Sequence, residues 1–496
     1  MSRLTNEQVD VVARQVLEAL GVSLAGAAPK VPDVPALPQA DPSVAPPPPK
    51  VDASGVQGIF PDVNSAVAAA QKAHLELMEM TLAKREKMIA SIRAKMTKYG
   101  EYLARKAHKE TGYGRAEDKV LKNALVTTKT PGTEVLKPTA YTGDRGMTLI
   151  ELAPYGVIGA ITPVTNPTSS IICNAIGMVS AGNAVVFNPH PGAKSICNET
   201  IVLINEAITA VGGPRNLVTG VGNPTIESAG ELMHHPGIRL LVVTGGAGVV
   251  NAAMESGKRA VCAGPGNPPV VVDETADLDL AAEKIVFGAS LDNNIICVDE
   301  KEVFVVESVA DELLRKMQQH KAVIVPKDKH AALEKVIFTK QNGPRKHASV
   351  NKDWIGKNAA LILEQIGMHV DPGTRLAVMD VAEDHPLVWS EQMMPVLPVV
   401  RVKDVDRAID LAKEAEHGFG HSAIMYSRNI DKLSRMARVM NCSIFVKNGP
   451  AAAGLGFGGE GYCSFSIASP TGEGLTNSRT FARERRCVLV DHFRIV

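Results

Sequence analysis

Cys297 is the residue of this sequence best placed to act as a nucleophile. It ends the run Asp292–Cys297, which follows a helical segment and precedes an expected strand at Glu302–Val306. Loops at strand ends are where α/β proteins place reacting groups, and a cysteine thiolate can attack a carbonyl carbon. A lone cysteine is also a common small buried hydrophobe, so its position alone leaves both a catalytic and a structural role open.

Two glycine-rich stretches could contact phosphate groups. Leu240–Val243 is an apolar run that leads into Thr244–Gly248, the pattern of a strand that turns into a helix. Backbone N–H groups at such a turn can face a pyrophosphate. The run lacks the full G-x-G-x-x-G spacing, so a purely structural turn stays an alternative. A second glycine turn, expected around Gly220, adds weight to nucleotide binding.

Length and composition indicate a large folded protein that has no net positive charge to attract polyanions. The chain has 496 residues, of which 45% are hydrophobic, enough for more than one core. Lys+Arg and Asp+Glu both total 53, so no net charge attracts nucleic acid or an anionic membrane. The longest apolar stretch, Ser169–Phe187, contains Asn174 and Gly182, which favours a buried helix and turn. We therefore expect no nucleic-acid partner and no membrane span.

The seven cysteines indicate a reducing compartment and no metal site. They are odd in number and widely spaced, and none forms a C-x-x-C pair. The adjacent His234 and His235 cannot both face one metal on a helix. The N-terminus lacks the pattern of a secretory signal, so we expect a cytosolic protein.

The sequence pattern of residues 1–56 predicts a short N-terminal helix that a linker connects to the rest of the chain. Residues 1–21 contain an amphipathic pattern at Thr5–Leu20, and Gly21 is well placed to end the helix. Residues 22–56 are rich in proline, with four in a row at Pro46–Pro49, and predict an extended linker. A short helix held away from the body is most simply a docking peptide that folds on a partner. Packing on its own domain is the alternative.

Alternating patterns predict an α/β fold. From about Gly58, helical patterns within Val63–Met96 give way to strand runs that alternate with helical ones, which predicts a parallel doubly wound sheet. A second series begins near Pro269, so we expect two such domains, and 486–496 could be a strand that pairs with another subunit. The predicted strands are Thr148–Glu151, Val157–Ile161, Ala184–Phe187, Leu240–Val243, Pro269–Val272, Glu302–Val306, Ala423–Tyr426 and Ser443–Val446.

The motifs from about Gly58 to the C-terminus resemble the aldehyde dehydrogenase superfamily, and within it the CoA-acylating branch of bacterial microcompartments. Val157–Pro167 is similar to the strand and loop that carry an asparagine beside the nucleophile. Phe187–Lys194 and Thr111–Lys119 are similar to segments of the acylating branch, the first on the adenosine side. Ser390–Val396 resembles the segment whose glutamate holds the nicotinamide ribose.

The resemblance implies roles for individual residues. Cys297 would form the thioester, with a thiol pKa that a helix terminus or bound NAD⁺ lowers. Asn166 would hold the oxyanion together with the Cys297 backbone N–H, although its place before a proline also suits a loop cap. Glu391 would bind the nicotinamide ribose, although a solvated surface carboxylate is the usual state of glutamate. The remaining expected cofactor residues are Thr162, Pro163, Asn188, Pro189, His190, Gly220, Thr244, Gly245 and Gly246.

Cys262 marks a departure from the hydrolytic members of the superfamily. They carry a glutamate before the segment that corresponds to Ala263–Pro269, and Cys262 stands at its position. That glutamate activates water for thioester hydrolysis, so its absence favours coenzyme A as the acyl acceptor. Cys262 itself is expected to be an inert small side chain, with a secondary thiol as the alternative. The competing functions are a hydrolytic aldehyde dehydrogenase and a catalytically silent interaction protein.

The resemblance thus implies an NAD-dependent oxidoreductase that converts a short aldehyde and coenzyme A to acyl-CoA and NADH, with propanal expected ahead of ethanal or a hydroxyaldehyde. It implies a homodimer or homotetramer, and docking of residues 1–21 to shell or cargo proteins in a microcompartment of the bacterial cytoplasm. The expected domains are 57–264 for NAD, with an oligomerisation hairpin near 138–152, then 265–470 for the catalytic cysteine and 471–496 for a C-terminal oligomerisation strand. The expected fold is aldehyde dehydrogenase-like, two doubly wound α/β domains plus a β arm.

Overall fold

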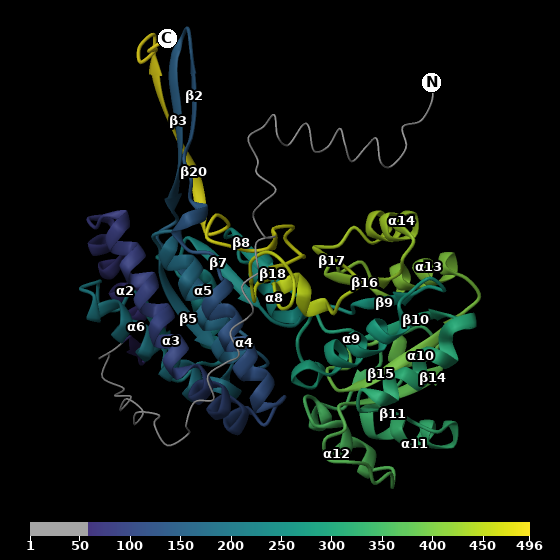
Figure 1. Ribbon diagram of the computed structural model, residues 1–496. Helices are drawn as coiled ribbons and strands as arrows, with labels where there is room; N and C mark the ends of the chain where they lie inside the picture. Colours follow the sequence, from purple (N-terminus) through teal and green to yellow (C-terminus); the bar gives the residue numbers. More distant parts are fainter. Residues whose placement is uncertain (1–57) are drawn as a thin grey trace, which may run out of the picture. The chain divides into compact units, whose positions relative to one another are not determined.

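The computed structural model describes residues 58–496 (Figure 1). Within this range, a six-stranded and a seven-stranded sheet carry most of the chain, and a three-stranded sheet forms an arm. Two α/β domains with a β arm were expected, and the structure confirms them. The docking helix expected in 1–21 and the linker expected in 22–56 lie outside the described residues.

The first sheet is parallel, with the strand order β1-β6-β5-β4-β7-β8. Its strands are β1 (Ile59–Phe60), β4 (Val157–Thr162), β5 (Ala184–Pro189), β6 (Val218–Val221), β7 (Leu240–Thr244) and β8 (Ala260–Ala263). The chain leaves β4 toward β5 and β6 on one side and returns to β7 and β8 on the other. Open α/β sheets bind ligands at such a reversal, beyond the carboxyl ends of the two strands involved. Here those strands are β4 and β7.

Helices connect and cover these strands. Asp62 and Thr81 begin the first two helices, because each side chain accepts a bond from a backbone N–H in the first turn. The helices of this half are α2 (Val63–Met78), α3 (Leu82–Thr111), α4 (Ala116–Lys129), η2 (Thr133–Val135), α5 (Pro167–Ser180), η3 (Pro191–Ala193), α6 (Lys194–Ala210), α7 (Ile226–His234) and α8 (Ala247–Glu255).

The longest apolar stretch, Ser169–Phe187, forms most of α5, a turn and most of β5. Pro167 stands in the first turn of α5, where its missing N–H costs no hydrogen bond, and every residue of this helix is buried. Gly182 has a φ of 87° and supplies the left-handed turn that leads into β5. Among the residues that the structure describes, no helix combines the length and hydropathy that crossing a membrane requires.

The second sheet is also parallel, with the order β11-β14-β15-β10-β9-β16-β17. Its strands are β9 (Pro269–Val272), β10 (Glu302–Val306), β11 (Ala322–Ile324), β14 (Leu376–Val381), β15 (Val396–Val402), β16 (Ser422–Tyr426) and β17 (Ile444–Lys447). The helices around it are α9 (Leu278–Ser290), η4 (Leu291–Asn294), α10 (Glu307–Gln319), α11 (Lys327–Ile337), η5 (Lys352–Trp354), α12 (Ala359–Glu364), η6 (Pro386–Trp389), α13 (Val405–Ala415), α14 (Ile430–Met440) and η7 (Ala451–Leu455). The hairpin β12 (Phe338–Lys340) and β13 (Ser349–Val350) stands beside it.

Gly220 lies in strand β6, and the glycine turn expected around it was wrong. β6 pairs with β5 on one side and with β1 on the other. Val218 and Val221 are buried, which favours a strand. A Cβ at Gly220 would come within 2.6 Å of Ile201 Cδ1 on α6, so glycine here lets the helix approach the sheet. Two glycines in four residues more often mark a turn, and that rule misled the prediction.

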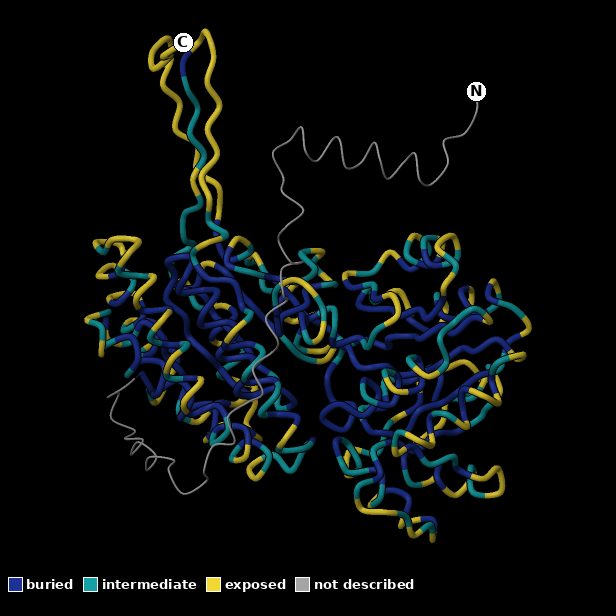
Figure 2. Tube along the Cα trace, in the orientation of Figure 1, coloured by how far each residue is buried: buried dark blue, intermediate teal, exposed yellow. Residues whose placement is uncertain are grey.

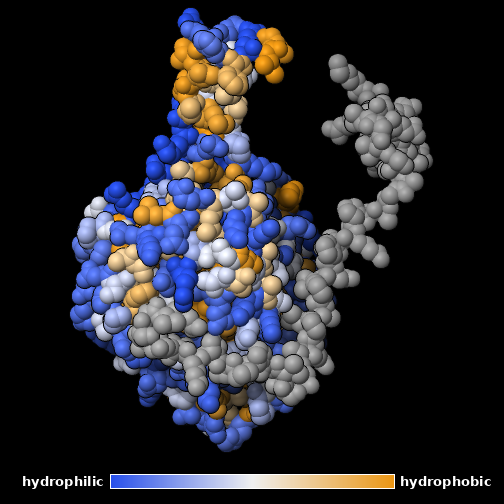
Figure 3. Space-filling view, turned by 90° about the vertical axis from the view of Figure 1, so that its left-hand side faces the viewer, coloured by the Kyte–Doolittle hydropathy of each residue, from blue (hydrophilic) through white to orange (hydrophobic). Residues whose placement is uncertain are grey.

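The arm is an antiparallel sheet with the order β2-β3-β20 (Figures 1 and 2). Its strands are β2 (Thr139–Gly143), β3 (Gly146–Pro154) and β20 (Ala482–Val490). The C-terminal strand therefore pairs with β3 of its own chain, while residues 492–496 form no strand. The second edge of β20 has no partner strand among residues 58–496. The exposed apolar side chains of this region are Tyr141, Val488, Leu489, Val490, Phe493, Ile495 and Val496 (Figure 3).

Residues 463–482 return to the first sheet. The Phe465 N–H donates to Cys173 Sγ of α5 at 3.4 Å, and a small pair of strands in this stretch packs beside β8. The domain boundary expected at 470 falls inside the stretch, whereas the one expected after 264 falls between β8 and β9. The small strands are β18 (Ile467–Ala468) and β19 (Gly474–Leu475).

Candidate active site

The loop before Cys297 has a left-handed backbone. Asp292, Asn293 and Asn294 have φ angles of 47°, 56° and 65°. Asparagine and aspartate tolerate this region better than other L-residues, because their short side chains bond to nearby groups. Three such residues in succession turn the chain sharply at the end of α9, so that Cys297 stands before β10.

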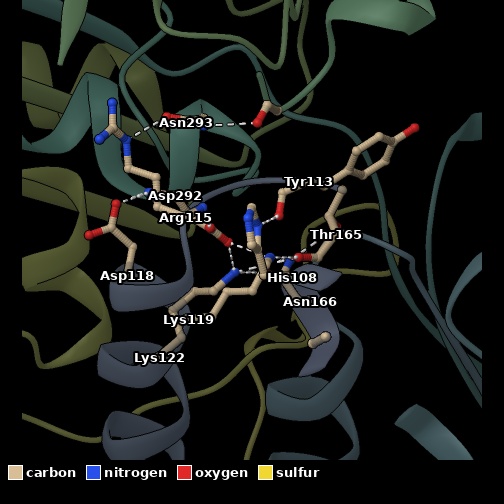
Figure 4. A network of polar contacts seen from close by, with 12 residues as sticks. His108, Tyr113, Arg115, Asp118, Lys119, Lys122, Thr165, Asn166, Asp292 and Asn293 are labelled. Carbon is tan, nitrogen blue, oxygen red and sulfur yellow. Dashed lines mark hydrogen bonds and ion pairs between the residues drawn. The ribbon is translucent and has the colours of Figure 1, made fainter. Parts of the chain in front are cut away.

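The Asp292 side chain holds this loop in place (Figure 4). Its carboxylate is fully buried and accepts bonds from Lys119 Nζ at 2.9 Å, from Lys122 Nζ, and from the Arg115 N–H at 2.7 Å. Burial alone would raise the pKa of Asp292, but the charges of the two lysines outweigh burial and lower it. The carboxylate is therefore ionised at neutral pH and ties the loop to α4.

Gly114 makes the approach of Asp292 possible. A Cβ at Gly114 would lie 1.9 Å from Asp292 Oδ1, and its φ of 72° is unfavourable for other residues. Asn293 adds two anchors: its Nδ2 donates to the Gly356 carbonyl at 2.8 Å, and its Oδ1 accepts from Arg115 Nε at 2.8 Å. The segment 111–119, singled out only by resemblance, thus serves to clamp the loop.

Asn166 stands at the N-terminus of α5 but does not cap it. Its side chain makes no capping bond to the helix, which speaks against the simple loop-cap role. Instead, Asn166 Oδ1 accepts from Lys122 Nζ at 2.7 Å, and Nδ2 donates to Thr165 Oγ1 at 3.1 Å. Lys122 therefore joins Asn166 to Asp292, five residues before Cys297, and the expected oxyanion donor and the nucleophile loop share one network.

The thiol of Cys297 is protonated in the ligand-free protein. The side chain keeps some exposure, but the protein packed around it makes burial the main influence, and the pKa of Cys297 is raised to about 12. The negative charge of Glu391 adds to this rise, and the positive charge of Lys301 opposes it. The expectation was a pKa that a helix terminus or bound NAD⁺ could lower. In the ligand-free protein no such lowering dominates, because burial and Glu391 raise the pKa of Cys297.

Gly266 brings three candidate groups together. Its N–H donates to Glu391 Oε1 at 3.4 Å, and a Cβ at this position would lie 2.7 Å from the Cys297 carbonyl oxygen and 3.0 Å from His421 Cγ. Burial raises the pKa of Glu391, against the opposing charge of Lys301. The resemblance gave Glu391 a role on the cofactor, and the structure places it beside the nucleophile.

Sequence reasoning missed His421. The residue is fully buried, and burial lowers the pKa of its imidazole to about 4, so the ring is neutral at physiological pH. Its Nδ1 lies 2.8 Å from Ser422 Oγ, while Nε2 is buried without a partner in the described residues. One histidine at the start of a strand gives no motif, so no sequence signal could have identified it.

The ends of β4 and β7 suit a dinucleotide. Thr162 ends β4 with a buried hydroxyl that has no hydrogen-bond partner within residues 58–496, and Pro163 follows it. Thr244 ends β7, and Gly246 begins α8 without a side-chain cap, so the first N–H groups of this helix remain available to a phosphate. A Cβ at Gly246 would meet nothing within 4 Å. A Cβ at Gly245 would lie 2.6 Å from Cγ1 of Val249, which is on α8 itself.

The other expected cofactor residues lie at the end of β5 or away from it. Asn188 is buried, and its Oδ1 accepts from Ser228 Oγ at 2.6 Å, so its side chain is engaged by α7. Pro189 ends β5, and the exposed His190 donates its N–H to the Thr162 carbonyl at 3.0 Å, which joins the ends of β4 and β5. Gly220 lies inside β6, two strands from β4.

Cys262 is a buried thiol at the end of β8. Its N–H donates to Thr471 Oγ1 at 3.0 Å. Burial raises the pKa of Cys262 to about 11, and the charge of Glu473 contributes. A neutral thiol at this position cannot act as a general base at physiological pH.

A cavity of about 680 Å³ lies beside the network rather than at the nucleophile. Asp118 and Arg375, which form an ion pair at 2.9 Å, line it together with the stacked rings of Phe287 and Phe457. Cys297 does not line this cavity. Within residues 58–496 no three His, Cys, Asp or Glu side chains gather to hold a metal ion.

A family model for the aldehyde dehydrogenase family matches residues 51–476. The chain belongs to the aldehyde dehydrogenase family. The match covers both α/β domains and the segments that carry Asn166, Cys297 and Glu391.

Several relatives are named as acetaldehyde or propionaldehyde dehydrogenases. The chain is 51% identical, over 88% of its length and 94% of the relative's, to the acetylating acetaldehyde dehydrogenase EutE of Salmonella typhimurium. A crystal structure of Rhodopseudomonas palustris propionaldehyde dehydrogenase with bound CoA and an acylated cysteine has 46% identity and a TM-score of 0.85, covering 88% of this chain and 98% of that one. A propionaldehyde dehydrogenase from the fucose utilisation microcompartment of Clostridium phytofermentans has 46% identity and a TM-score of 0.86, covering 88% and 100%.

The charge of Glu391 predicts a measurable change at Cys297. In Glu391→Gln the thiolate loses a negative neighbour, so the pKa of Cys297 should fall and its alkylation by iodoacetamide at about pH 8 should speed up severalfold. The rate is followed on the Cys297 peptide by mass spectrometry, because six other cysteines are present. Glu473→Gln is the control, since that charge acts on Cys262. An unchanged rate in Glu391→Gln would contradict this assignment.

Proposed function

We propose that this chain is an NAD-dependent, CoA-acylating aldehyde dehydrogenase for short aldehydes. One observation carries the choice of acceptor: the neutral, buried Cys262 stands where the resemblance puts the glutamate of hydrolytic members. The acetylating and CoA-bound relatives support it. These relatives are named for a two-carbon and for a three-carbon aldehyde, so we propose both ethanal and propanal as substrates. Propanal, which the sequence analysis put first, is the first to test.

The proposed reaction begins at Cys297. Its thiolate attacks the aldehyde carbon and gives a thiohemiacetal, whose oxyanion accepts bonds from Asn166 Nδ2 and the Cys297 N–H. NAD⁺, when bound, supplies the acceptor for the hydride that leaves this carbon. The thioester left on Cys297 is then attacked by the thiolate of coenzyme A, which releases acyl-CoA and restores the cysteine. His421 and Glu391, which both contact Gly266, border the reacting groups.

The residues at the ends of β4 and β7 fit NAD. The unpartnered hydroxyl of Thr162 and the uncapped start of α8 at Gly246 supply donors on the two strands where the sheet order reverses. Glu391 is proposed to hold the nicotinamide ribose.

Coenzyme A dependence tests the function. NADH formation from propanal or ethanal and NAD⁺ should require coenzyme A and should fall by roughly 10³ or more in Cys297→Ala, because the nucleophile is lost. Cys262→Ala is the matched control: its buried thiol takes no part, so coenzyme A-dependent turnover should persist. Sustained turnover without coenzyme A would identify water as the acceptor and refute the acylating assignment. No turnover with any aldehyde would favour the silent interaction protein.

We also propose that the chain is a homodimer or homotetramer assembled through its arm. Among residues 58–496 no strand pairs with the second edge of β20. This edge and the apolar side chains of the C-terminal stretch form a surface that these residues leave in water. Val488 and Val490 have the same parity along β20, and both are more than half exposed, at 57% and 61%.

Charges on this strand should separate the subunits. The double variant Val488→Asp, Val490→Asp should sediment as a monomer in analytical ultracentrifugation, because carboxylates resist burial in an interface. Ile226→Asp on α7, where the isoleucine is 84% exposed, is the control and should keep the wild-type mass. If the double variant sedimented like the wild type, the arm would not be the interface.

We further propose that residues 1–21 direct the enzyme to the lumen of a microcompartment by binding a shell or cargo protein. The amphipathic sequence pattern and the proline-rich linker support it, together with the microcompartment origin of a relative. In a bacterium that assembles such compartments, Val12→Asp with Val16→Asp should remove the full-length enzyme from purified compartments while its activity stays unchanged. The control Arg14→Gln should remain with them. Retention of the double variant would refute docking through this apolar face.

A further inference from the structure

Lys122 is a buried cation that bonds the Asn166 side chain. Its Nζ lies 2.7 Å from Asn166 Oδ1 and 3.4 Å from the Thr165 carbonyl oxygen, and it pairs with Asp292 (Figure 4). A lysine ammonium has three donors and no acceptor, so the atom that faces it is the amide oxygen. The charge of Lys122 therefore decides which way the Asn166 amide is turned.

The NH₂ group of Asn166 consequently faces away from Lys122. One of its two hydrogens is donated to Thr165 Oγ1 at 3.1 Å, which leaves the second for a substrate oxygen. Hydrogen bonds in a chain polarise one another, and a charged donor on the amide oxygen does so most strongly. The N–H groups of Asn166 are thus stronger donors than those of a free amide.

We propose that Lys122 is a positioning residue for the reaction: it turns the Asn166 N–H toward the developing oxyanion and polarises it. The inference rests on the proposed function, in which Asn166 donates to that oxyanion. In this role Lys122 acts through Asn166 and needs no contact with the substrate. Its partner Asp292 compensates its charge, so the ammonium can stay buried.

Lys119 is a natural control for this role. It lies one turn earlier on α4 and is equally buried, with 2% exposure against 4% for Lys122. It pairs with Asp292 at 2.9 Å and reaches the Thr165 carbonyl at 3.4 Å, and none of its bonds goes to Asn166. Either lysine can be removed while the other still compensates Asp292, so neither change leaves an unpaired buried carboxylate.

The test compares Lys122→Met with Lys119→Met in the full chain, each alone and combined with Asn166→Ala. The readouts are the first-turnover rate of NADH formation and the aldehyde KM, and thermal melting confirms that each variant folds. Lys122→Met should lower the rate by roughly ten- to a hundredfold, a share of the 10²–10³ that one oxyanion donor contributes, and leave KM nearly unchanged. Lys119→Met should lower the rate much less.

The Asn166→Ala background separates positioning from a general structural role. There, the extra loss in Lys122→Met over Lys119→Met should vanish, because no amide remains to be oriented. Equal losses in the two lysine variants, or a Lys122→Met loss that persists without Asn166, would overturn the proposal. If Asn166→Ala by itself left the rate unchanged, the oxyanion role of Asn166 would fail first, and the inference with it.

Discussion

The active site depends on one buried carboxylate. Asp292 lies in a left-handed backbone run that costs energy at every residue, and it is removed from water, which penalises its charge. Both costs are met by the same contacts, since Lys119, Lys122 and the Arg115 N–H satisfy its oxygens. Because the donors all come from α4 and the residue before it, the loop of the second domain is held by the first. The place of the nucleophile is therefore set by an interaction between domains.

Positive charge lies on the Asp292 side of the nucleophile loop, and negative charge lies beside Cys297. Two lysines face one carboxylate, and burial lowers the pKa of Lys119 to about 8, so Lys119 loses its proton well before an ordinary lysine would. On the other side of the loop, burial and Glu391 keep the Cys297 thiol neutral. The ligand-free protein thus holds positive charge on the oxygen of the Asn166 amide and keeps the Cys297 thiol neutral. A positive group placed beside Cys297 and Glu391 would favour the thiolate, so NAD⁺ bound at the proposed site beside Glu391 would activate the nucleophile.

Sequence patterns predicted most strands of the two sheets, because a buried parallel strand is a short apolar run that few other segments resemble. All eight predicted strands are present, and Gly220 was misread because its glycine serves helix packing inside a strand. Lys119 and Lys122 could not be found this way, since charged residues on a helix are normally solvated. Their burial follows from a carboxylate that lies 173 residues after Lys119 and 170 residues after Lys122. Motif resemblance singled out Cys297 and Asn166 as candidates, but it gave no sign of the contacts that hold the Asn166 side chain and the loop before Cys297.

A single oxyanion site serves both halves of the proposed reaction. Attack of Cys297 on the aldehyde and attack of coenzyme A on the thioester each place negative charge on the same oxygen, because the carbon stays bonded to Cys297 Sγ throughout. A donor that Lys122 has already oriented need not rearrange between the two steps, and fixed donors cost no reorganisation as charge develops. In the proposed reaction the acceptor is decided elsewhere, at Cys262, whose neutral thiol supplies no base. This separation lets one oxyanion site work with different acyl acceptors, since exchanging the base at that position leaves the network of Asp292, Lys122 and Asn166 untouched.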